Sequence, residues 1–246
     1  MSALQKTGFR LLAAGEAALV VELGETIDAA VNQRVHVLDA AIAAAKLAGV
    51  VETVPTYRSI LVSFDPLATD AEALGAAIAA IAAGDLDHAA PSGRRWFIPV
   101  AFGGEYGEDL EDVARRTALS TDEVVRLHTA EDYRVYMLGF SPGFAYLGTL
   151  PKPLHLPRRE TPRLKTPAGS VMQGGAQAAI SPTAMPSGWH ILGRTPVRIF
   201  DLAAAQPFLL APGDHVRFVA IAPARFAGLA ALAEQGKLVP DTEALS

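Results

Sequence analysis

The sequence predicts an α+β protein with a small α/β domain followed by a larger domain built mainly of β-strands. Apolar residues recur at helical spacing twice within residues 1–84, each time after a pair of short strand-like runs. Residues 84–95 are polar and rich in turn-forming types, and they show no periodicity. Beyond residue 133, short apolar runs alternate with glycine and proline, as in strands joined by turns. The predicted domains are therefore residues 1–88 and residues 89–246.

Two strands and a helix are predicted to open the first domain. The strands cover residues 9–13 and 17–23 and meet at a turn that contains Gly15. Asp28 is predicted to cap the helix, because its carboxylate can accept hydrogen bonds from the unpaired N–H groups of the first turn. The apolar face of this helix consists of Val31, Val35, Leu38 and Ile42. Gly49 is expected to end the helix.

A second pair of strands follows at residues 50–57 and 59–64, and a second helix comes after them. Thr69 and Glu72 have the spacing of a capping box at the start of this helix, and Gly84 is expected to end it. Its apolar face consists of Leu74, Ile78 and Ile81. Elements in this order can pack as a small sheet covered on one side by two helices, and we expect a ferredoxin-like arrangement.

The second domain is predicted to begin with a strand at residues 96–100, followed by two short helices. Residues 118–120 separate these helices, and Ser120 and Glu123 form a capping-box pair at the start of the second one. No helical period is visible over residues 133–223. The strands and turns of that stretch are most economically arranged as a closed or folded-over β-structure.

Composition places the chain among ordinary globular proteins, since half of its 246 residues are hydrophobic and 19% are charged. No cysteine is present, which excludes disulfides, thiolate metal sites and cysteine nucleophiles. The first ten residues lack the features of a signal peptide, and charged residues interrupt the alanine-rich stretches before they reach the length of a membrane span. We therefore expect a soluble protein of the cytoplasm with no membrane partner.

Residues 139–143 read GFSPG and fit G-x-S-x-G, the pattern that presents a nucleophilic serine in α/β-hydrolases. That arrangement needs a helix after the serine, and it uses the backbone N–H of the next residue for the oxyanion hole. The next residue is Pro142, which has no N–H, and the following GFAYLGTLP is a poor start for a helix. Ser141 is therefore predicted to lie in a loop between strands rather than to attack a substrate.

Three other kinds of site are not supported by the sequence. Residues 110–128 have the outline of a helix-turn-helix, but the second helix begins with acidic residues and offers Arg126 as its only permanent cation, so no nucleic-acid partner is expected. The six histidines include no H-E-x-x-H pattern, so no metal site is predicted. The glycine cluster at residues 103–107 runs into two acidic residues, whose carboxylates would compete with a phosphate.

The strongest local charge signal is the segment KPLHLPRRETPRLK at residues 152–165, with five basic residues and one glutamate. Prolines fix the backbone between its arginines, and arginine forks bind carboxylate, phosphate or planar amide groups at two points. With later residues such as Gln177 and Arg194, this segment can form a rigid pocket for an anionic small molecule. A solvated arginine face with structural turns explains the same residues equally well, and the sequence leaves both interpretations open.

Long motifs across nearly the whole chain resemble one protein family. They are HTAEDYRVYMLGFSPGFAYLGTLPKPLHLPRRETPRLKTPAGSV, GWHILGRTPVRIFD and APGDHVRF, preceded by VPTYRSILVSFDP and IPVAFGGEYGEDLEDVA. The family they resemble is that of the 5-oxoprolinase B subunit, also called allophanate hydrolase subunit 1 or the KipI-like carboxyltransferase domain. The resemblance implies an N-terminal α/β domain and a C-terminal cyclophilin-like β-barrel.

The resemblance also implies an activity that needs partners. The B subunit of this family works with a C subunit and a third, lactam-opening subunit, and the complex converts 5-oxo-L-proline to L-glutamate at the expense of ATP. The component of the complex that binds ATP stays open. The same resemblance leaves two alternatives, namely a urea or allophanate carboxyltransferase-type subunit served by a biotin carrier elsewhere, and an inhibitor of a sensor histidine kinase.

Phosphorylating the lactam oxygen would make a poor electrophile reactive toward water, and arginines would stabilise the anionic groups by charge-assisted hydrogen bonds. The resemblance therefore implies catalytic roles for Arg158, Arg163, Arg194 and Gln177. The residues implied to bind the substrate are Phe144, Tyr146, His155, Arg159, Ser170 and Trp189. Where relatives tend to read Q-T-G-I-Y-P, residues 177–182 read Q-A-A-I-S-P, and this departure leaves the identity of the substrate open.

Overall fold

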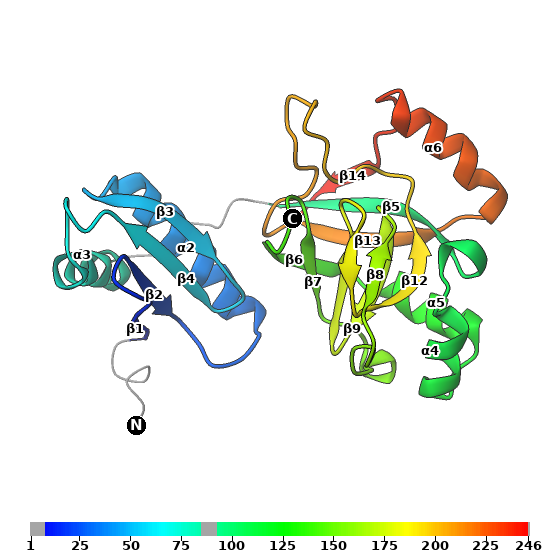
Figure 1. The fold of residues 1–246 in the computed structure, drawn as a ribbon, viewed down its shortest axis with the longest axis horizontal. Coiled ribbons are helices and arrows are strands. Elements are labelled where there is room, and N and C mark those ends of the chain that lie inside the picture. The colour runs from blue at the N-terminus through cyan, green and yellow to red at the C-terminus, as the bar shows by residue number, and fades with distance from the viewer. Residues whose placement is uncertain (1–7, 85–92, 246) are drawn as a thin grey trace. The chain divides into compact units, whose positions relative to one another are not determined.

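The computed structural model describes residues 8–84 and 93–245, and the chain divides into two compact units, Met1–Pro91 and Ser92–Ser246 (Figure 1). The predicted domain boundary at residue 88 lies outside the described residues. Each unit has a hydrophobic core of its own, as expected for an independent domain.

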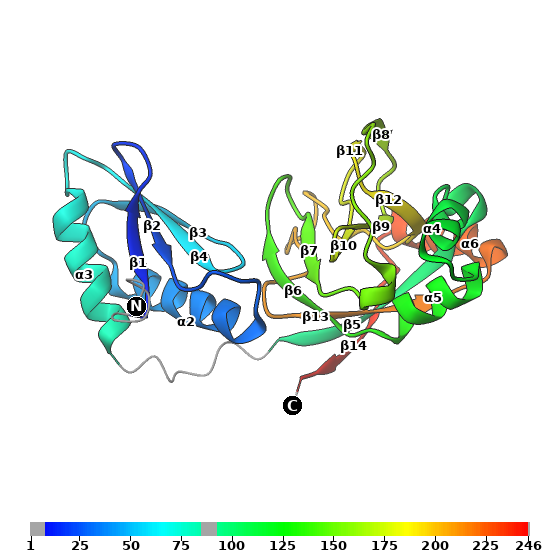
Figure 2. The same ribbon diagram turned by 90° about the horizontal axis from the view of Figure 1, so that it is seen from below.

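The first unit is a four-stranded antiparallel sheet with two helices on one face (Figures 1 and 2). Its elements are β1 (Arg10–Ala13), β2 (Ala18–Glu22), α2 (Ala29–Ala45), β3 (Val50–Pro55), β4 (Ser59–Phe64) and α3 (Ala71–Ala83), and the strands lie in the order β1-β2-β4-β3. Val21 and Val62 of the central strands are fully buried in one cluster with Leu38 and Ile78 of the helices. The predicted sheet with helices on one side is confirmed, whereas the ferredoxin-like arrangement stays a prediction.

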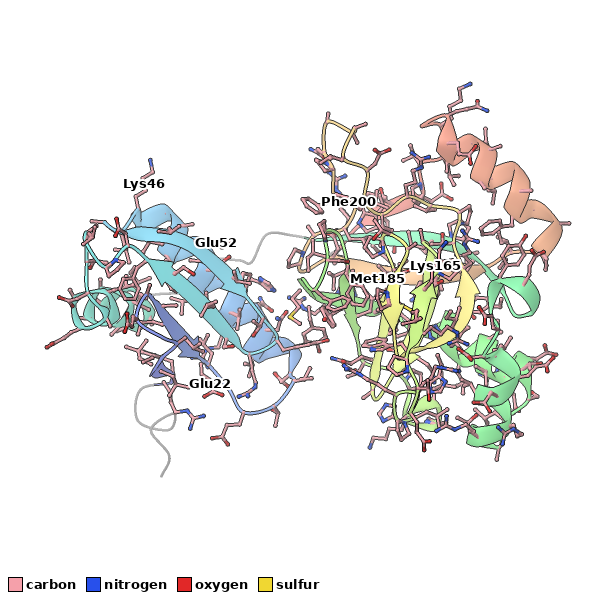
Figure 3. All side chains as sticks on the ribbon, viewed as in Figure 1. Glu22, Lys46, Glu52, Lys165, Met185 and Phe200 are labelled. Atoms are coloured by element: carbon pink, nitrogen blue, oxygen red, sulfur yellow. The ribbon has the colours of Figure 1, made fainter. Side chains whose placement is uncertain are left out.

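The ends of the two helices differ in part from the prediction. The carboxylate of Asp28 accepts two hydrogen bonds from the first turn of α2, so this cap is confirmed. Helix α2 ends at Lys46, which has left-handed backbone (φ 47°) and is labelled in Figure 3, so the predicted end at Gly49 is wrong. The cap of α3 is Asp70 rather than Thr69, because the Asp70 carboxylate accepts a 2.8 Å hydrogen bond from the first turn. In both cases another residue within one turn makes the capping contact.

The second unit contains ten strands and three α-helices among its described residues. The strands are β5 (Arg94–Phe102), β6 (Tyr133–Leu138), β7 (Ala145–Gly148), β8 (Arg163–Thr166), β9 (Ser170–Gly174), β10 (Gln177–Ile180), β11 (Met185–Ser187), β12 (His190–Arg194), β13 (His215–Ala220) and β14 (Asp241–Ala244). The helices are α4 (Leu110–Thr117), α5 (Thr121–Ala130) and α6 (Phe226–Glu234). Strands β8 and β11 pair only with each other and form a short ribbon beside the main sheet.

Seven of these strands close into a barrel, in the order β12-β9-β10-β7-β6-β13-β5, with β5 pairing back onto β12. Strand β14 pairs with β5 outside this ring. The pairing of β5 with β13 is parallel, and the other pairings of the ring are antiparallel. The predicted closed β-structure is confirmed, and its more specific cyclophilin-like description stays a prediction.

Helices α4 and α5 pack against the barrel and share its core. Val113 of α4 and Val124 of α5 are fully buried in the same cluster as the barrel residues Ile98, Leu147 and Val216. The predicted capping box is confirmed, because the Ser120 hydroxyl and the Glu123 carboxylate each accept a hydrogen bond from the other's backbone N–H. Over residues 8–84 and 93–245, no helix has the length and apolar character needed to cross a membrane.

Candidate functional site

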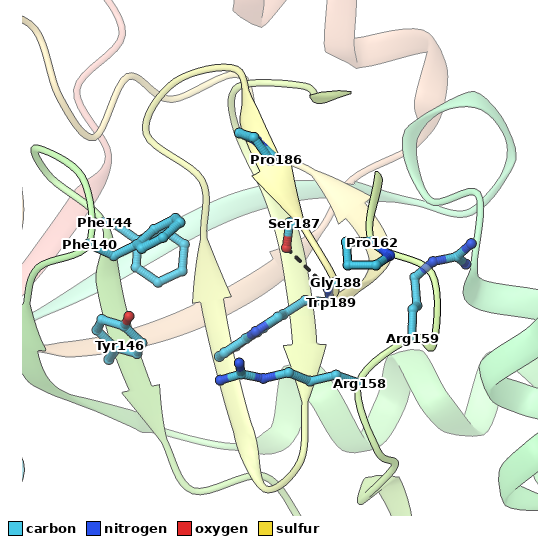
Figure 4. Close-up of a pocket in the computed structure, with 10 residues that line it drawn as sticks. All are labelled: Phe140, Phe144, Tyr146, Arg158, Arg159, Pro162, Pro186, Ser187, Gly188 and Trp189. Atoms are coloured by element: carbon cyan, nitrogen blue, oxygen red, sulfur yellow. Dashed lines mark hydrogen bonds between the residues drawn. The ribbon is translucent and has the colours of Figure 1, made fainter. Parts of the chain in front are cut away.

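An aromatic cavity of about 290 Å³ opens beside strand β7 of the barrel (Figure 4). Four aromatic side chains line it, namely Phe140, Phe144, Tyr146 and Trp189. Figure 4 shows Phe140, Phe144 and Tyr146 together on one side of the cavity. It also shows the side chain of Arg158 running along Trp189. We call this space the aromatic cavity.

The rings of the aromatic cavity meet edge to face. The Phe144 centroid lies 4.9 Å from Tyr146 at 67° and 5.6 Å from Phe140 at 73°. Trp189 meets Phe144 at 6.2 Å and 86°. Perpendicular contacts of this kind are worth about 0.5–1.5 kcal/mol each beyond the burial of area, and they hold the rings in fixed orientations. These contacts stabilise the orientations of the rings, whose apolar surfaces can contact a small planar ligand.

Strand geometry and one glycine place these rings. Side chains alternate along β7, so Ala145 and Leu147 enter the barrel core while Tyr146 points to the other face. Trp189 lies directly against β9, because Gly174 has no Cβ there and an added Cβ would lie 3.0 Å from the indole. The sequence departure noted above adjoins this wall, since Ala179 pairs with Tyr146 and belongs to the same buried cluster.

Arg158 supplies the positive charge of the aromatic cavity. Its guanidinium carbon lies 5.5 Å from the centre of the Trp189 ring, which is the geometry of a cation–π contact. Among the described residues, no carboxylate lies within ion-pair distance of Arg158, and its side chain is exposed. Burial raises the pKa of the Tyr146 hydroxyl, and the charge of Arg158 partly opposes that shift. Arg158 can therefore form a charge-assisted bond with an anionic group of a ligand.

The loop GFSPG carries one wall of the cavity. The backbone of Phe140 has left-handed φ (69°), which is uncommon for a bulky residue, and its side chain is 73% exposed. Gly143 has φ 80°, and an added Cβ there would lie 2.7 Å from Phe200. The hydroxyl of Ser141 is buried and has no hydrogen-bond partner among the described residues, so no base activates it. Phe140 was not predicted from the sequence, because its strain appears only in the folded loop.

Arg159 and Arg163 are held by a buried carboxylate. Asp109, at the start of α4, is 3% exposed and accepts hydrogen bonds from Arg159 at 2.8 Å, from Arg163 at 2.7 and 2.8 Å, and from the Ile191 N–H at 2.7 Å. Burial raises the pKa of Asp109, but the Arg163 hydrogen bonds, the Ile191 N–H and the two arginine charges together hold that pKa below its ordinary value. This cluster fixes the Arg-Pro segment to the barrel, and it keeps both guanidinium groups from free contact with a ligand.

The other predicted site residues lie apart from the aromatic cavity. Arg194 donates a 2.9 Å hydrogen bond to the Ala168 carbonyl and lines a different cavity with Phe226. Ser170 is 1% exposed and donates to the Pro167 carbonyl at 2.8 Å. The remaining two are half-buried Gln177 at the start of β10 and exposed His155, whose ring nitrogen lies 2.8 Å from the Leu150 carbonyl. The structure thus brings together Phe144, Tyr146, Arg158, Arg159 and Trp189.

Comparison with known proteins identifies relatives over most of the chain. Residues 9–210 match the family model described as carboxyltransferase domain, subdomain C and D. A protein of Escherichia coli O157:H7 that is named as the B subunit of 5-oxoprolinase is 41% identical over 219 residues, which cover 83% of this chain and 93% of that protein. Its namesake in Bacillus subtilis (strain 168) is 36% identical over 217 residues, which cover 84% of this chain and 90% of that protein.

Solved structures share the fold. TTHA0988 is 35% identical with a TM-score of 0.74 over 83% of this chain, which spans only 40% of that longer chain. The conserved uncharacterized protein PH0987 from Pyrococcus horikoshii is 41% identical with a TM-score of 0.53 over 88% of this chain and 100% of its own. The K. lactis urea amidolyase reaches a TM-score of 0.80 over 96% of this chain and 16% of its own at 20% identity, which is a likeness of fold alone. The chain belongs to the carboxyltransferase-domain family that includes the 5-oxoprolinase B subunit.

Proposed function

We propose that this chain is the B subunit of an ATP-dependent 5-oxoprolinase complex, which converts 5-oxo-L-proline to L-glutamate with release of ADP and phosphate. The names of the relatives in three bacteria support this function. The observation that carries it is the aromatic cavity, which combines flat apolar walls with an arginine that has no carboxylate partner among the described residues. The complex would work in the cytoplasm, and its other members would be a C subunit and a third, lactam-opening subunit.

The chemistry of the substrate fits this cavity. 5-Oxoproline is a small five-membered lactam that carries one carboxylate. The faces of Tyr146 and Trp189 can contact the flat ring, and the guanidinium of Arg158 can pair with the carboxylate. In a partly desolvated site such a pair also fixes the orientation of the lactam carbonyl. Arg159 and Arg163 act in this proposal as positioning residues, because Asp109 holds them. The roles implied for Arg194, Gln177, His155 and Ser170 stay predictions.

The glycine turn at residues 103–107 is not proposed as the ATP site of the complex. The turn at residues 103–107 is the part of this chain that comes nearest to a phosphate-binding loop, and Gly103 and Gly104 there have φ values of 70° and 52°. However, Glu108 follows this turn directly, and Asp109 beside it already holds two arginines. A phosphate at that place would face like charge and compete with existing ion pairs. The turn at residues 103–107 is therefore not proposed as a nucleotide site, and the proposed task of this chain is to bind the lactam.

The experiment that tests this function is reconstitution of the complex. The chain is co-expressed with its two partner proteins, the C subunit and the lactam-opening subunit, and formation of glutamate and ADP from 5-oxoproline is measured with each protein omitted in turn. Activity that disappears without this chain is the expected result. An assembled complex that leaves 5-oxoproline unchanged but acts on urea or another amide would contradict the proposal. Failure of the chain to associate at all would favour a regulatory protein instead.

The aromatic cavity is tested by one arginine variant. In the complex, Arg158→Ala should lower kcat/KM for 5-oxoproline by about 100-fold or more, which corresponds to about 3 kcal/mol of transition-state stabilisation. Arg198→Ala is the matched control, because Arg198 is half-exposed in the same unit and pairs at 3.3 Å with Asp201. Full activity of the Arg158→Ala complex would show that 5-oxoproline does not bind in the aromatic cavity.

A further inference from the structure

A second cavity, of about 600 Å³, shares Arg158 and Arg159 with the aromatic cavity. Residues Arg115 and Arg116 of α4 line it together with Arg158 and Arg159. The two latter arginines therefore line both cavities, and Figure 4 shows their side chains leaving the segment in different directions. We call the second space the arginine cavity.

Positive charge exceeds negative charge in the lining of the arginine cavity. Asp109 already neutralises Arg159, so three arginines, Arg115, Arg116 and Arg158, face the two carboxylates of Asp112 and Glu160. Arg115 and Arg116 share the single carboxylate of Asp112, the latter at a distance of 3.7 Å. Arg158 has no carboxylate within ion-pair distance among residues 8–84 and 93–245. Several guanidinium forks around one concave space attract an anion and can bind its oxygens at two points each.

A buried histidine at this cavity narrows the class of anion. His190 lines the arginine cavity, is fully buried, and has its Nε2 2.9 Å from the Pro157 carbonyl. A carbonyl accepts only from an N–H, so Nε2 carries the proton in the neutral ring and Nδ1 is an acceptor. Nδ1 has no partner among the described residues. Near neutral pH phosphate, with a second pKa of about 6, keeps a fraction of its molecules with an O–H donor beside negative oxygens, whereas a carboxyl group, with an ordinary pKa of about 4, is ionised and offers no donor.

We propose that the arginine cavity binds a phosphate group and forms, with the aromatic cavity, one two-part site. The ligand of such a site joins a planar ring to a phosphate, with Arg158 between its two ends. This inference rests on the proposed function, because a lactam phosphorylated on its oxygen has that form. The arginine cavity then holds the phosphate while the rings of the aromatic cavity hold the lactam.

Titration of the full chain with inorganic phosphate at constant ionic strength tests the anion site directly. We expect saturable binding that Arg116→Gln weakens about tenfold or more, since hydrogen bonds to charged groups are worth that much. Asp112→Asn should tighten binding instead, because it removes the carboxylate that neutralises Arg115 and Arg116. A gain of affinity cannot come from damage to the fold. Arg198→Gln should leave the affinity unchanged. The proposed anion site is wrong if phosphate does not bind, or if Arg116→Gln and Asp112→Asn both leave the affinity for phosphate unchanged.

The reconstituted complex tests the link to the lactam. Arg116→Gln should lower kcat while leaving KM for 5-oxoproline within about twofold, because the phosphate is present only after phosphorylation. An increased KM with unchanged kcat would mean that the arginine cavity holds the unmodified lactam, which overturns the two-part site. A complex that is inactive with wild-type chain while phosphate titration follows the expected pattern would refute the proposed function and leave the anion site standing.

Discussion

His128 makes the stability of the second unit sensitive to acid. Its ring is fully buried at the end of α5 among Phe102, Tyr133 and Phe218, with centroid distances of 6.2, 5.3 and 5.3 Å. Neither ring nitrogen has a hydrogen-bond partner among the described residues. Burial lowers the pKa of His128 from 6.5 to about 3, because the protonated ring would lose its hydration without gaining a partner.

The magnitude follows from the difference in proton binding between the two states. Below pH 6.5 the unfolded chain binds a proton at His128 and the folded chain does not, so stability falls as pH falls from 6.5 toward 3 and levels off below that. Each pH unit in this window costs about 1.4 kcal/mol. Between pH 7.5 and pH 4.5 the loss due to His128 is therefore about 3 kcal/mol.

Urea unfolding of wild type and His128→Leu at both pH values measures this loss. Both tryptophans, Trp96 and Trp189, belong to the unit Ser92–Ser246, so their fluorescence reports on the unit that contains His128. The variant should lose about 3 kcal/mol less than wild type over this interval, since carboxylates titrate alike in both proteins. Tyr133→Phe is the matched control, because it removes a neighbouring buried hydroxyl whose pKa is raised by burial, far from this window. Equal losses in wild type and His128→Leu would refute the reasoning.

Two further substitutions test the residues that support the aromatic cavity. Asp109→Ala leaves Arg163, whose side chain is 17% exposed, without its buried carboxylate, and it should lower the free energy of unfolding by about 3–5 kcal/mol in the same urea assay. Gly143→Ala places a Cβ 2.7 Å from Phe200 at a φ of 80°, and should cost about 1–3 kcal/mol and raise KM for 5-oxoproline by moving Phe144. Exposed Arg158→Ala, by contrast, should change stability by less than about 0.5 kcal/mol. A stable Asp109→Ala protein, or a Gly143→Ala complex with unchanged KM, would contradict these roles.

Local signals account for what the sequence predicted of the fold. The capping box at Ser120 and the cap at Asp28 depend on contacts within three residues, and both are confirmed. Strand β14 was not predicted as such, because its partner β5 lies far away along the chain. The ribbon of β8 and β11 was not predicted as such, because each of these strands pairs only with one short strand. The observed helix ends at Lys46 and Asp70 differ from the predicted ends at Gly49 and Thr69, because a residue nearby can make the capping contact instead.

The candidate site was harder to predict, because its arginines look alike in sequence. Arg158, Arg159 and Arg163 stand in one proline-spaced run, yet a buried carboxylate holds only the last two. That carboxylate, Asp109, is 50 residues from Arg159 and 54 residues from Arg163 along the chain, and its place after a glycine cluster indicated only that a phosphate would not bind there. Arg158 lines a cavity, as the interpretation of the run as a pocket expects. Arg163 binds Asp109 and has a structural role, as the alternative interpretation expects.

The closure of the barrel also bears on how the chain acquires its fold during synthesis. Strand β5 is the first strand of the second unit to leave the ribosome, yet its partners β12, β13 and β14 are synthesised much later. Ala101 can pair only after Arg194 has been synthesised, and Trp96 can pair with Val216 only after that residue has been synthesised. The first unit, in contrast, has all its strand partners within residues 10–64. The first unit can thus fold while the second is still being translated, and β5 stays an unpaired strand until late. A translation arrest within residues 140–190 should therefore leave a folded first unit attached to an aggregation-prone fragment.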